Sequence, residues 1–211
     1  MNRDLREELL RRRDLDQNAR SEAASGGEEA FRRVLAIDDD NAAWFAQIVD
    51  QAGWPGRSRT GEDGAHAAWL LAQHADRHPA LQRRCLKLLR GAVSAGEASA
   101  ADLAHLTDRV LLSGGKAQIY GTQLVARDGH FVARRLRHPE SVDRRRAAAG
   151  LEPLEAALER ARQMYGAPVP AMMPCRTCHQ EIEVWLPEPG ERLTVKCPAC
   201  QSPMTVRLRV G

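Results

Sequence analysis

Residues 175–200 have the sequence CRTCHQEIEVWLPEPGERLTVKCPAC, which begins and ends with two cysteines separated by two residues. The pairs are Cys175 with Cys178 and Cys197 with Cys200. Two such pairs at this separation are typical of a zinc site, because each short turn brings two thiolates to one tetrahedral ion. Four thiolates leave no open position for water, so we predict a structural zinc ion and not a catalytic one.

Apolar and polar residues alternate around the cysteines, as expected for strands with one apolar face. The apolar positions are Ile182, Val184, Leu186, Leu193, Val195, Met204, Val206, Leu208 and Val210. With a turn at residues 187–191, this pattern predicts a small three-stranded antiparallel zinc ribbon over residues 175–211. A module of this size has too small a core to fold alone, so metal binding would supply much of its folding free energy.

The residues that precede the ribbon predict a helical domain over residues 1–165 and a proline-containing linker over residues 166–174. Apolar residues recur there at helical spacing, and the helices predicted from this spacing cover residues 4–24, 62–77, 79–95, 99–112, 139–149 and 152–165. Between the first two of these we expect a short helix from residue 28 and a separate helix that ends near residue 53.

Two local signals complete the predicted domain. The run Asp38-Asp39-Asp40-Asn41 offers side-chain oxygens that could cap the start of the helix ending near residue 53. Asp128-Gly129 predicts the turn of a hairpin, because both residues tolerate a positive φ. The expected fold is therefore mainly α, a multi-helix domain with a small β-hairpin, followed by the ribbon.

Composition limits the classes of function. The chain has 211 residues and a net charge of +3, which is too mild to indicate a phosphate-binding surface. Its first residues are charged, and no stretch reaches the ~18 apolar residues of a membrane span. Cys85 lies on the apolar face of a predicted helix and is interpreted as a packed thiol. We expect a cytoplasmic protein without membrane contact, in a compartment that keeps thiols reduced.

Three groups of polar residues interrupt the apolar pattern of the helical domain. They comprise Gln73, His74 and Asp76; Asp108 and Arg109; and Gln118, Tyr120 and Gln123. In one interpretation His74 is a base or a metal ligand oriented by Asp76, with Arg109 and Tyr120 stabilising charge. Gln73, Asp108, Gln118 and Gln123 would be further members of that site. In the other interpretation these residues are a hydrated helix end, helix caps and hairpin hydrogen bonds.

Several of these motifs together resemble a bacterial family catalogued as a domain of unknown function, DUF6624. The resemblance rests on segments spread over residues 4–165: Asp16-Gln17 with Arg20, Trp54-Pro55, residues 68–76 (AWLLAQHAD), residues 108–110 (DRV), residues 118–123 (QIYGTQ), residues 144–146 (RRR), Gly150-Leu151 and Pro153-Leu154. It leaves the cysteine module outside as an addition. Because the family has no established activity, the resemblance implies a single domain and no particular chemistry.

Three functions remain as hypotheses. The first is an adaptor that binds a protein or peptide, with the ribbon as an added docking surface. The second is a hydrolase-like enzyme with a site centred on His74. A nucleic-acid-associated factor comes third because of the mild net charge. The phosphate-binding loops and the common metalloprotease and serine-hydrolase motifs are absent from the sequence.

Overall fold

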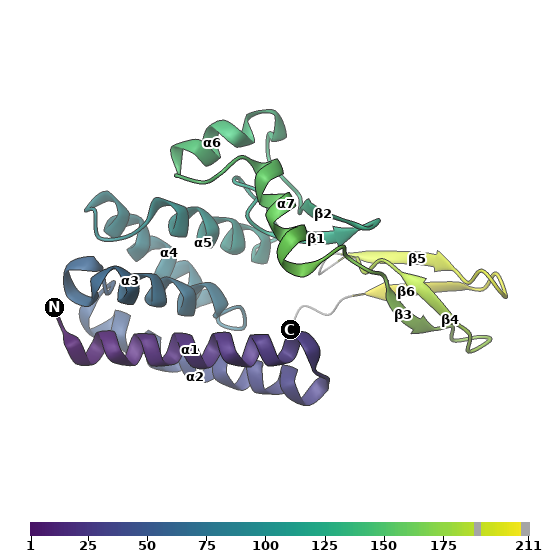
Figure 1. The fold of residues 1–211 in the computed structure, drawn as a ribbon, viewed down its shortest axis with the longest axis horizontal. Helices are drawn as coiled ribbons and strands as arrows, with labels where there is room; N and C mark the ends of the chain where they lie inside the picture. The colour runs from purple at the N-terminus through teal and green to yellow at the C-terminus, as the bar shows by residue number, and fades with distance from the viewer. Residues whose placement is uncertain (188–190, 208–211) are drawn as a thin grey trace. The chain divides into compact units, whose positions relative to one another are not determined.

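The computed structural model describes residues 1–187 and 191–207, and these residues form two compact units. The first, here called the helical unit, is Met1–Tyr120, and the second, the C-terminal unit, begins at Gly121. The helical unit contains five helices (Figure 1), with bounds α1 Arg3–Ser25, α2 Glu28–Ala52, α3 Arg57–His74, α4 Pro79–Ser94 and α5 Ala100–Ser113. A mainly α fold is thereby confirmed. No described helix is long and apolar enough to cross a bilayer.

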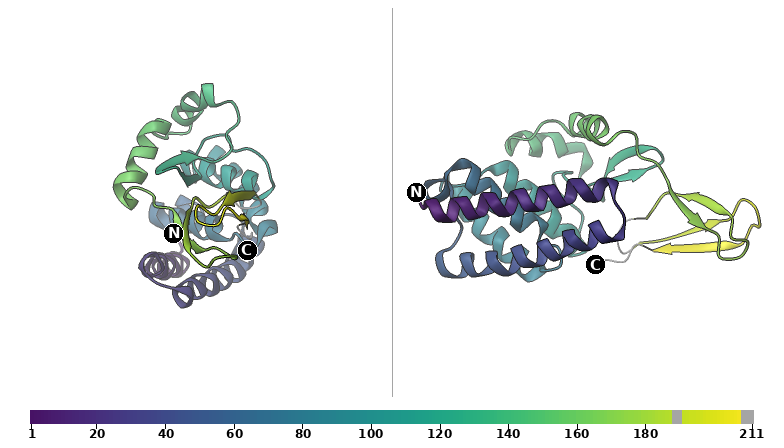
Figure 2. Two further views of the ribbon diagram at one scale, coloured as in Figure 1. Left: turned by 90° about the vertical axis from the view of Figure 1, so that its right-hand side faces the viewer. Right: turned by 60° about the horizontal axis from the view of Figure 1, so that its bottom comes forward.

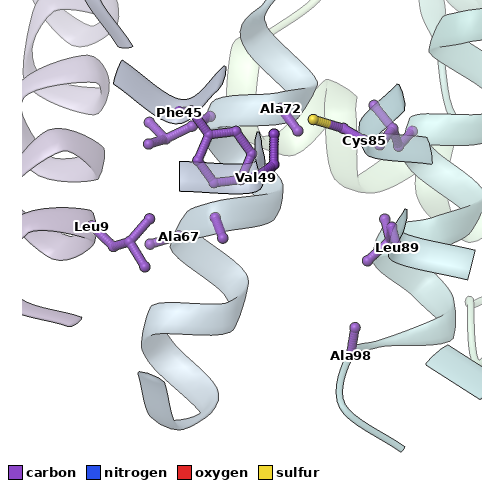
Figure 3. Packing of buried hydrophobic residues seen from close by; sticks show 11 residues of the cluster. Leu9, Phe45, Val49, Ala67, Ala72, Cys85, Leu89 and Ala98 are labelled. Atoms are coloured by element: carbon purple, nitrogen blue, oxygen red, sulfur yellow. The ribbon is translucent and has the colours of Figure 1, made fainter. Parts of the chain in front are cut away.

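The core of the helical unit forms around α3. This helix packs on α1, α2, α4 and α5, and α1 and α2 lie side by side in both views of Figure 2. Ala67, Ala68 and Ala72 are fully buried, and their small side chains allow neighbouring helices to approach α3 closely. Figure 3 shows buried side chains from different helices meeting there, among them Leu9, Phe45, Ala67, Cys85 and Leu89.

One prediction for this unit is wrong. Residues 28–52 form the single helix α2, and Asp38, Asp39 and Asp40 lie within it instead of capping a new one. Their carboxylates pair outside α2: Asp38 with Arg20, Asp39 with Arg77 and His78, and Asp40 with Arg12. Ion pairs between elements therefore account for the acidic run that resembled a cap signal.

Other helix boundaries follow the predicted local signals. Ser99 caps α5, because its hydroxyl accepts hydrogen bonds from the amides of Ala101 and Asp102. Pro79 occupies the first turn of α4, where its missing amide costs little. Helix α3 begins five residues earlier than expected and is interrupted at Gly61, whose φ of 75° suits glycine.

The C-terminal unit begins with the predicted hairpin, formed by β1 (Leu124–Arg127) and β2 (His130–Ala133). Asp128 and Gly129 make the turn with φ values of 49° and 79°, as expected for this dipeptide. The 3-10 helix η1 (Pro139–Ser141), α6 (Val142–Ala148) and α7 (Leu154–Tyr165) follow. Arg146 is buried and donates a hydrogen bond from Nε to the carbonyl of Glu152, which joins α6 to the start of α7.

The C-terminal module, residues 171–207, has two strand pairs in place of one three-stranded sheet. The strands are β3 Ala171–Pro174, β4 Glu181–Val184, β5 Arg192–Lys196 and β6 Pro203–Arg207, paired antiparallel as β3 with β4 and β5 with β6. Each pair surrounds one cysteine turn, so β3 forms within the stretch that was expected to be a linker. Leu208, Val210 and the centre of the expected turn at 188–190 lie outside the described residues.

Candidate functional site

The candidate site in the helical unit is built on a contact between a histidine of α3 and a carboxylate of α1. Nδ1 of His74, the last residue of α3, lies 2.9 Å from both carboxylate oxygens of Asp16 in α1. The Asp16 side chain is 1% exposed and that of His74 is 15% exposed. His74 therefore lies at the edge of the core, with a fully buried carboxylate against its ring.

Arg20 and Asp38 complete this group. The guanidinium of Arg20 donates from Nη2 to Asp38 at 2.5 Å, and its Nε lies 3.1 Å from Nδ1 of His74. The same Nε is 3.2 Å and 3.3 Å from the two oxygens of Asp16. Asp16, Asp38 and His74 offer ligand atoms that all lie within 4.8 Å of one another. We call Asp16, Arg20, Asp38 and His74 the His74 cluster.

Burial and charge shift the pKa values within the His74 cluster in different directions. Burial alone would raise the pKa of Asp16, but the hydrogen bond and charge of His74 and the charge of Arg20 lower it to about 2. Burial raises the pKa of Asp38 to about 6, and the negative charge of Asp16 adds to this effect. Burial also lowers the pKa of His74, despite Asp16, so the neutral imidazole is favoured near pH 7.

Asp76 is not the carboxylate that contacts Nδ1 of His74. It accepts two hydrogen bonds from Arg109, with Nε at 2.8 Å and Nη2 at 2.6 Å. Its Oδ1 also accepts a hydrogen bond from Nε2 of the buried Gln82 at 3.1 Å. Asp76 and Arg109, predicted together, thus form an ion pair with each other, and the charge of Arg109 acts on the pKa of His74.

Of the other predicted residues, Asp108 bonds to backbone amides and Gln123 belongs to the C-terminal unit. Asp108 is fully buried and accepts hydrogen bonds from the amides of Ile119 and Tyr120. The predicted polar group that contains Asp108 therefore contacts the one that contains Tyr120. Gln118 is also fully buried. Gln123 belongs to the C-terminal unit, where its Nε2 donates to the hydroxyl of Thr122 at 3.2 Å.

Two buried glutamines adjoin these polar groups. Gln73 directly precedes His74, and Gln82 donates a hydrogen bond to Asp76. Oε1 of Gln73 and Oε1 of Gln82 have no hydrogen-bond partner among the described atoms. Gln73, next to His74, is 5% exposed, and Gln82 is 0% exposed. A buried polar atom without a partner is costly, so such atoms often mark a place for water or a ligand. The two Oε1 atoms, at the junction of α3 and α4, are therefore acceptors that a water molecule or a ligand can use.

Sequence reasoning about chemistry missed three members of the His74 cluster. Asp16 and Arg20 entered only through the family resemblance, and Asp38 was interpreted as part of a cap. The spacing of Asp16 and Arg20, four residues apart on α1, was an available signal for an ion pair on one helix face. Nothing in that spacing points to a histidine 58 positions later.

The four cysteines of the C-terminal module lie together as their spacing predicted. Sγ of Cys175 is 3.7 Å from Sγ of Cys200, and Sγ of Cys178 is 3.7 Å from Sγ of Cys197. A tetrahedral ion with metal–sulfur bonds near 2.3 Å requires sulfur–sulfur distances of about 3.8 Å. The four sulfurs, all within 4.8 Å of one another, therefore fit one tetrahedral metal ion.

The two cysteine turns share one backbone geometry. The amide of His179 donates to the carbonyl of Cys175, and the amide of Gln201 donates to the carbonyl of Cys197, both at 2.9 Å. His179 and Gln201, each directly after the second cysteine of its pair, have φ values of 61° and 60°. The two turns therefore present their thiols in equivalent ways, which suits a shared ion.

Comparison with known proteins identifies the family. The model of a family of unknown function, DUF6624, matches residues 3–170, which is most of the chain, so the protein belongs to this family. The His74 cluster and the polar groups around Asp76 and Asp108 lie inside the matched residues, and the four cysteines lie outside them. No curated protein and no solved structure gives a significant match.

Proposed function

We propose that this protein is a hydrolase-like enzyme that activates water at the His74 cluster, with a structural zinc ion in its C-terminal module. The contact between His74 and Asp16 carries the proposal. A neutral imidazole held by a buried carboxylate is an arrangement that enzymes use to take a proton from water or to hold an ion that does so. The depressed pKa of His74 agrees with either use.

Charge around the cluster supports the same proposal. Arg20 contacts both carboxylates, and Arg109 acts on His74 from the Asp76 side. The side chains of Arg20 and Arg109 are 32% and 28% exposed, so both can reach a bound molecule as well as their present partners. Guanidinium groups at such positions stabilise the negative charge that develops when water attacks an acyl or phosphoryl centre.

A panel of activated esters, phosphoesters and amides tests this proposal. Wild-type protein is compared with His74→Gln and with His78→Gln, a histidine four residues later that pairs with Asp39 at the surface. We expect turnover of one substrate class to fall by about 10²–10⁴-fold in His74→Gln and to persist in His78→Gln. Equal turnover in the two variants, or none by wild-type protein on any class, would count against a hydrolase.

The identity of the ion in the C-terminal module belongs to this proposal. Four thiolates in a tetrahedron favour zinc or iron, and zinc is the usual ion in closed structural sites of this kind. Elemental analysis of purified protein should give about one zinc per chain, and Cys175→Ser with Cys178→Ser should remove it. Iron in place of zinc, or no metal in correctly folded protein, would refute this part.

An adaptor role is the second candidate, and exposed apolar side chains favour it. Met164, Tyr165, Val169 and Met172 are 54–79% exposed within nine residues of chain. Contiguous exposed apolar surface often marks a contact with another protein. A photo-crosslinker at Val169 should capture a defined partner in cell extract, whereas one at the exposed, polar Arg162 should not. Equal labelling from both positions would exclude a specific protein-binding site around Val169.

A further inference from the structure

The atoms around Nδ1 of His74 and the carboxylate of Asp16 lie against the guanidinium of Arg20. If Nδ1 carries a proton, that proton is directed to Asp16 at 2.9 Å, and the N–H of Arg20 Nε donates to the same carboxylate at 3.2–3.3 Å. If Nδ1 carries no proton, it accepts from Arg20, and its lone pair then faces an ionised carboxylate with no proton between them. In the tautomer without this proton, the imidazole nitrogen and the carboxylate both present lone pairs to one cation.

A positive centre lies among these atoms. Nε of Arg20 lies 3.1–3.3 Å from Nδ1 of His74 and from both oxygens of Asp16, while its Nη2 contacts Asp38. The guanidinium thus occupies the point on which the lone pairs of these three residues converge. It stands in the place of a cation bound by one imidazole nitrogen and two carboxylates.

We propose that the His74 cluster binds one divalent cation through Asp16, Asp38 and Nδ1 of His74. The inference rests on the proposed function and specifies it: the ion activates the water, and His74 is a ligand of the ion. Bound water loses its proton more readily on a divalent cation than in bulk solvent. This ion is separate from the one held by the four cysteines.

Distances and charge fit such an ion. Ligand atoms at right angles around an ion with bonds of about 2.1 Å lie about 3.0 Å apart. The separation of Nδ1 from each Asp16 oxygen is 2.9 Å, and the full set lies within 4.8 Å. Arg20 compensates only one of the two carboxylates, so the cluster retains one negative charge. Two oxygen donors and one imidazole suit manganese, iron(II) or zinc.

Arg20 is the group that the ion displaces. Its side chain is 32% exposed, so the guanidinium can turn outward and keep its positive charge in water. Because it holds the same acceptors as the ion, Arg20 competes with metal binding. Removal of its charge should therefore strengthen metal binding, whereas loss of an ordinary structural ion pair would weaken the protein without creating a metal site.

Manganese titration of the full-length, zinc-loaded protein tests the proposal, because Mn²⁺ binds poorly to four thiolates and its free form is measured by electron paramagnetic resonance. Wild-type protein should bind about one Mn²⁺ saturably, and Asp38→Asn and His74→Gln should each weaken binding by about 10–100-fold or more. Asp14→Asn and Asp39→Asn are matched controls, since both remove exposed carboxylates near the same helix positions and should leave binding unchanged. Arg20→Met should bind Mn²⁺ about tenfold more tightly than wild-type protein.

The metal-binding outcomes decide the question without reference to turnover. Saturable binding that depends on Asp38 and His74 supports the site even if no substrate is found. Absence of saturable binding by wild-type protein, or equal loss in Asp14→Asn and Asp38→Asn, overturns it and leaves Arg20 as the permanent cation of the cluster. If Arg20→Met does not fold, the comparison of Asp38→Asn with Asp14→Asn still decides. Turnover that needs His74 but no added ion would refute the metal site and keep the hydrolase.

Discussion

The carboxylate of Asp16 in α1 contacts the imidazole of His74 at the end of α3 at 2.9 Å, across 58 positions of sequence. This contact joins two helices at the edge of the core, and Arg20 pairs with both Asp16 and Asp38 beside it. Asp16 therefore takes part in two buried contacts, one with His74 and one with Arg20.

Loss of the Asp16 carboxylate should destabilise the protein strongly. Asp16→Ala leaves His74 without its buried carboxylate and removes one of the two carboxylates that pair with Arg20. Removal of one member of a buried ion pair typically costs about 3–5 kcal/mol of unfolding free energy. Asp14→Ala is the control, because Asp14 is 60% exposed and pairs with its neighbour Arg13, so it should cost under about 1 kcal/mol. Urea unfolding followed by circular dichroism measures both. Similar values for the two variants would mean that Asp16 has no special partner.

The five cysteines should react with thiol reagents in two separate stages. Cys85 is fully buried, and burial raises the pKa of its thiol to about 12, so it should stay unreactive until the helical unit unfolds. The other four should be protected by their ion and become reactive when a chelator removes it. Counting free thiols should therefore give none in holo protein, four after chelation and five in denaturant. Four reactive thiols before chelation would contradict a metal-bound module.

The positive φ of His179 and Gln201 predicts an unusual tolerance of glycine beside the cysteine pairs. Glycine adopts this conformation without the cost of about 1–2 kcal/mol that a side chain imposes. His179→Gly and Gln201→Gly should therefore retain or improve zinc affinity, while His179→Val should weaken it by at least about 1 kcal/mol. Competition with a chromophoric chelator measures these affinities. Weaker binding by the glycine variants than by His179→Val would show that the turn geometry is different.

His66 and Asp102 predict a small pH dependence of stability away from the His74 cluster. Nδ1 of His66 lies 3.3 Å from Asp102, and this hydrogen bond raises the pKa of His66, beside a cavity of about 460 Å³ that both residues line. A pKa raised by folding means that the charged histidine stabilises the folded state. That stabilisation is complete below the ordinary pKa of about 6.5 and is lost as pH rises through the folded value.

Nuclear magnetic resonance titration of the His66 ring checks this prediction. The pKa of His66 should exceed its ordinary value in wild-type protein and fall toward that value in Asp102→Asn. In His66→Gln, unfolding free energy should vary less with pH between about 6 and 8 than it does in wild-type protein. A His66 pKa unaffected by Asp102→Asn would remove the basis for this pH dependence.

Local signals predicted the parts of this protein whose partners are close in sequence. The spacing of Cys175, Cys178, Cys197 and Cys200 predicted their convergence, since two short turns are enough to bring the thiols together. Ser99 as a cap and Asp128-Gly129 as a turn were predictable for the same reason. The cap, the hairpin turn and each of the two cysteine turns depend on interactions that span only a few residues.

The parts that could not be predicted depend on contacts between helices. Asp38 has the local character of a cap residue, and only the position of Arg20 on another helix gives it a different role. Asp76 is only two residues after His74 in the sequence. Its carboxylate nevertheless pairs with Arg109, and the imidazole of His74 contacts Asp16. Sequence proximity identified the region of the candidate site, but tertiary packing determined which side chains meet there.

The central claim is that Asp16, Asp38 and His74 act as one functional unit, and a double-mutant cycle tests it most directly. Turnover of the panel substrate is measured for wild-type protein, Asp38→Asn, His74→Gln and the double variant. Residues that act as a unit are strongly non-additive, so the double variant should be no slower than the slower single variant. If the two losses multiply in the double variant, or if neither substitution lowers turnover, these residues do not form the functional centre.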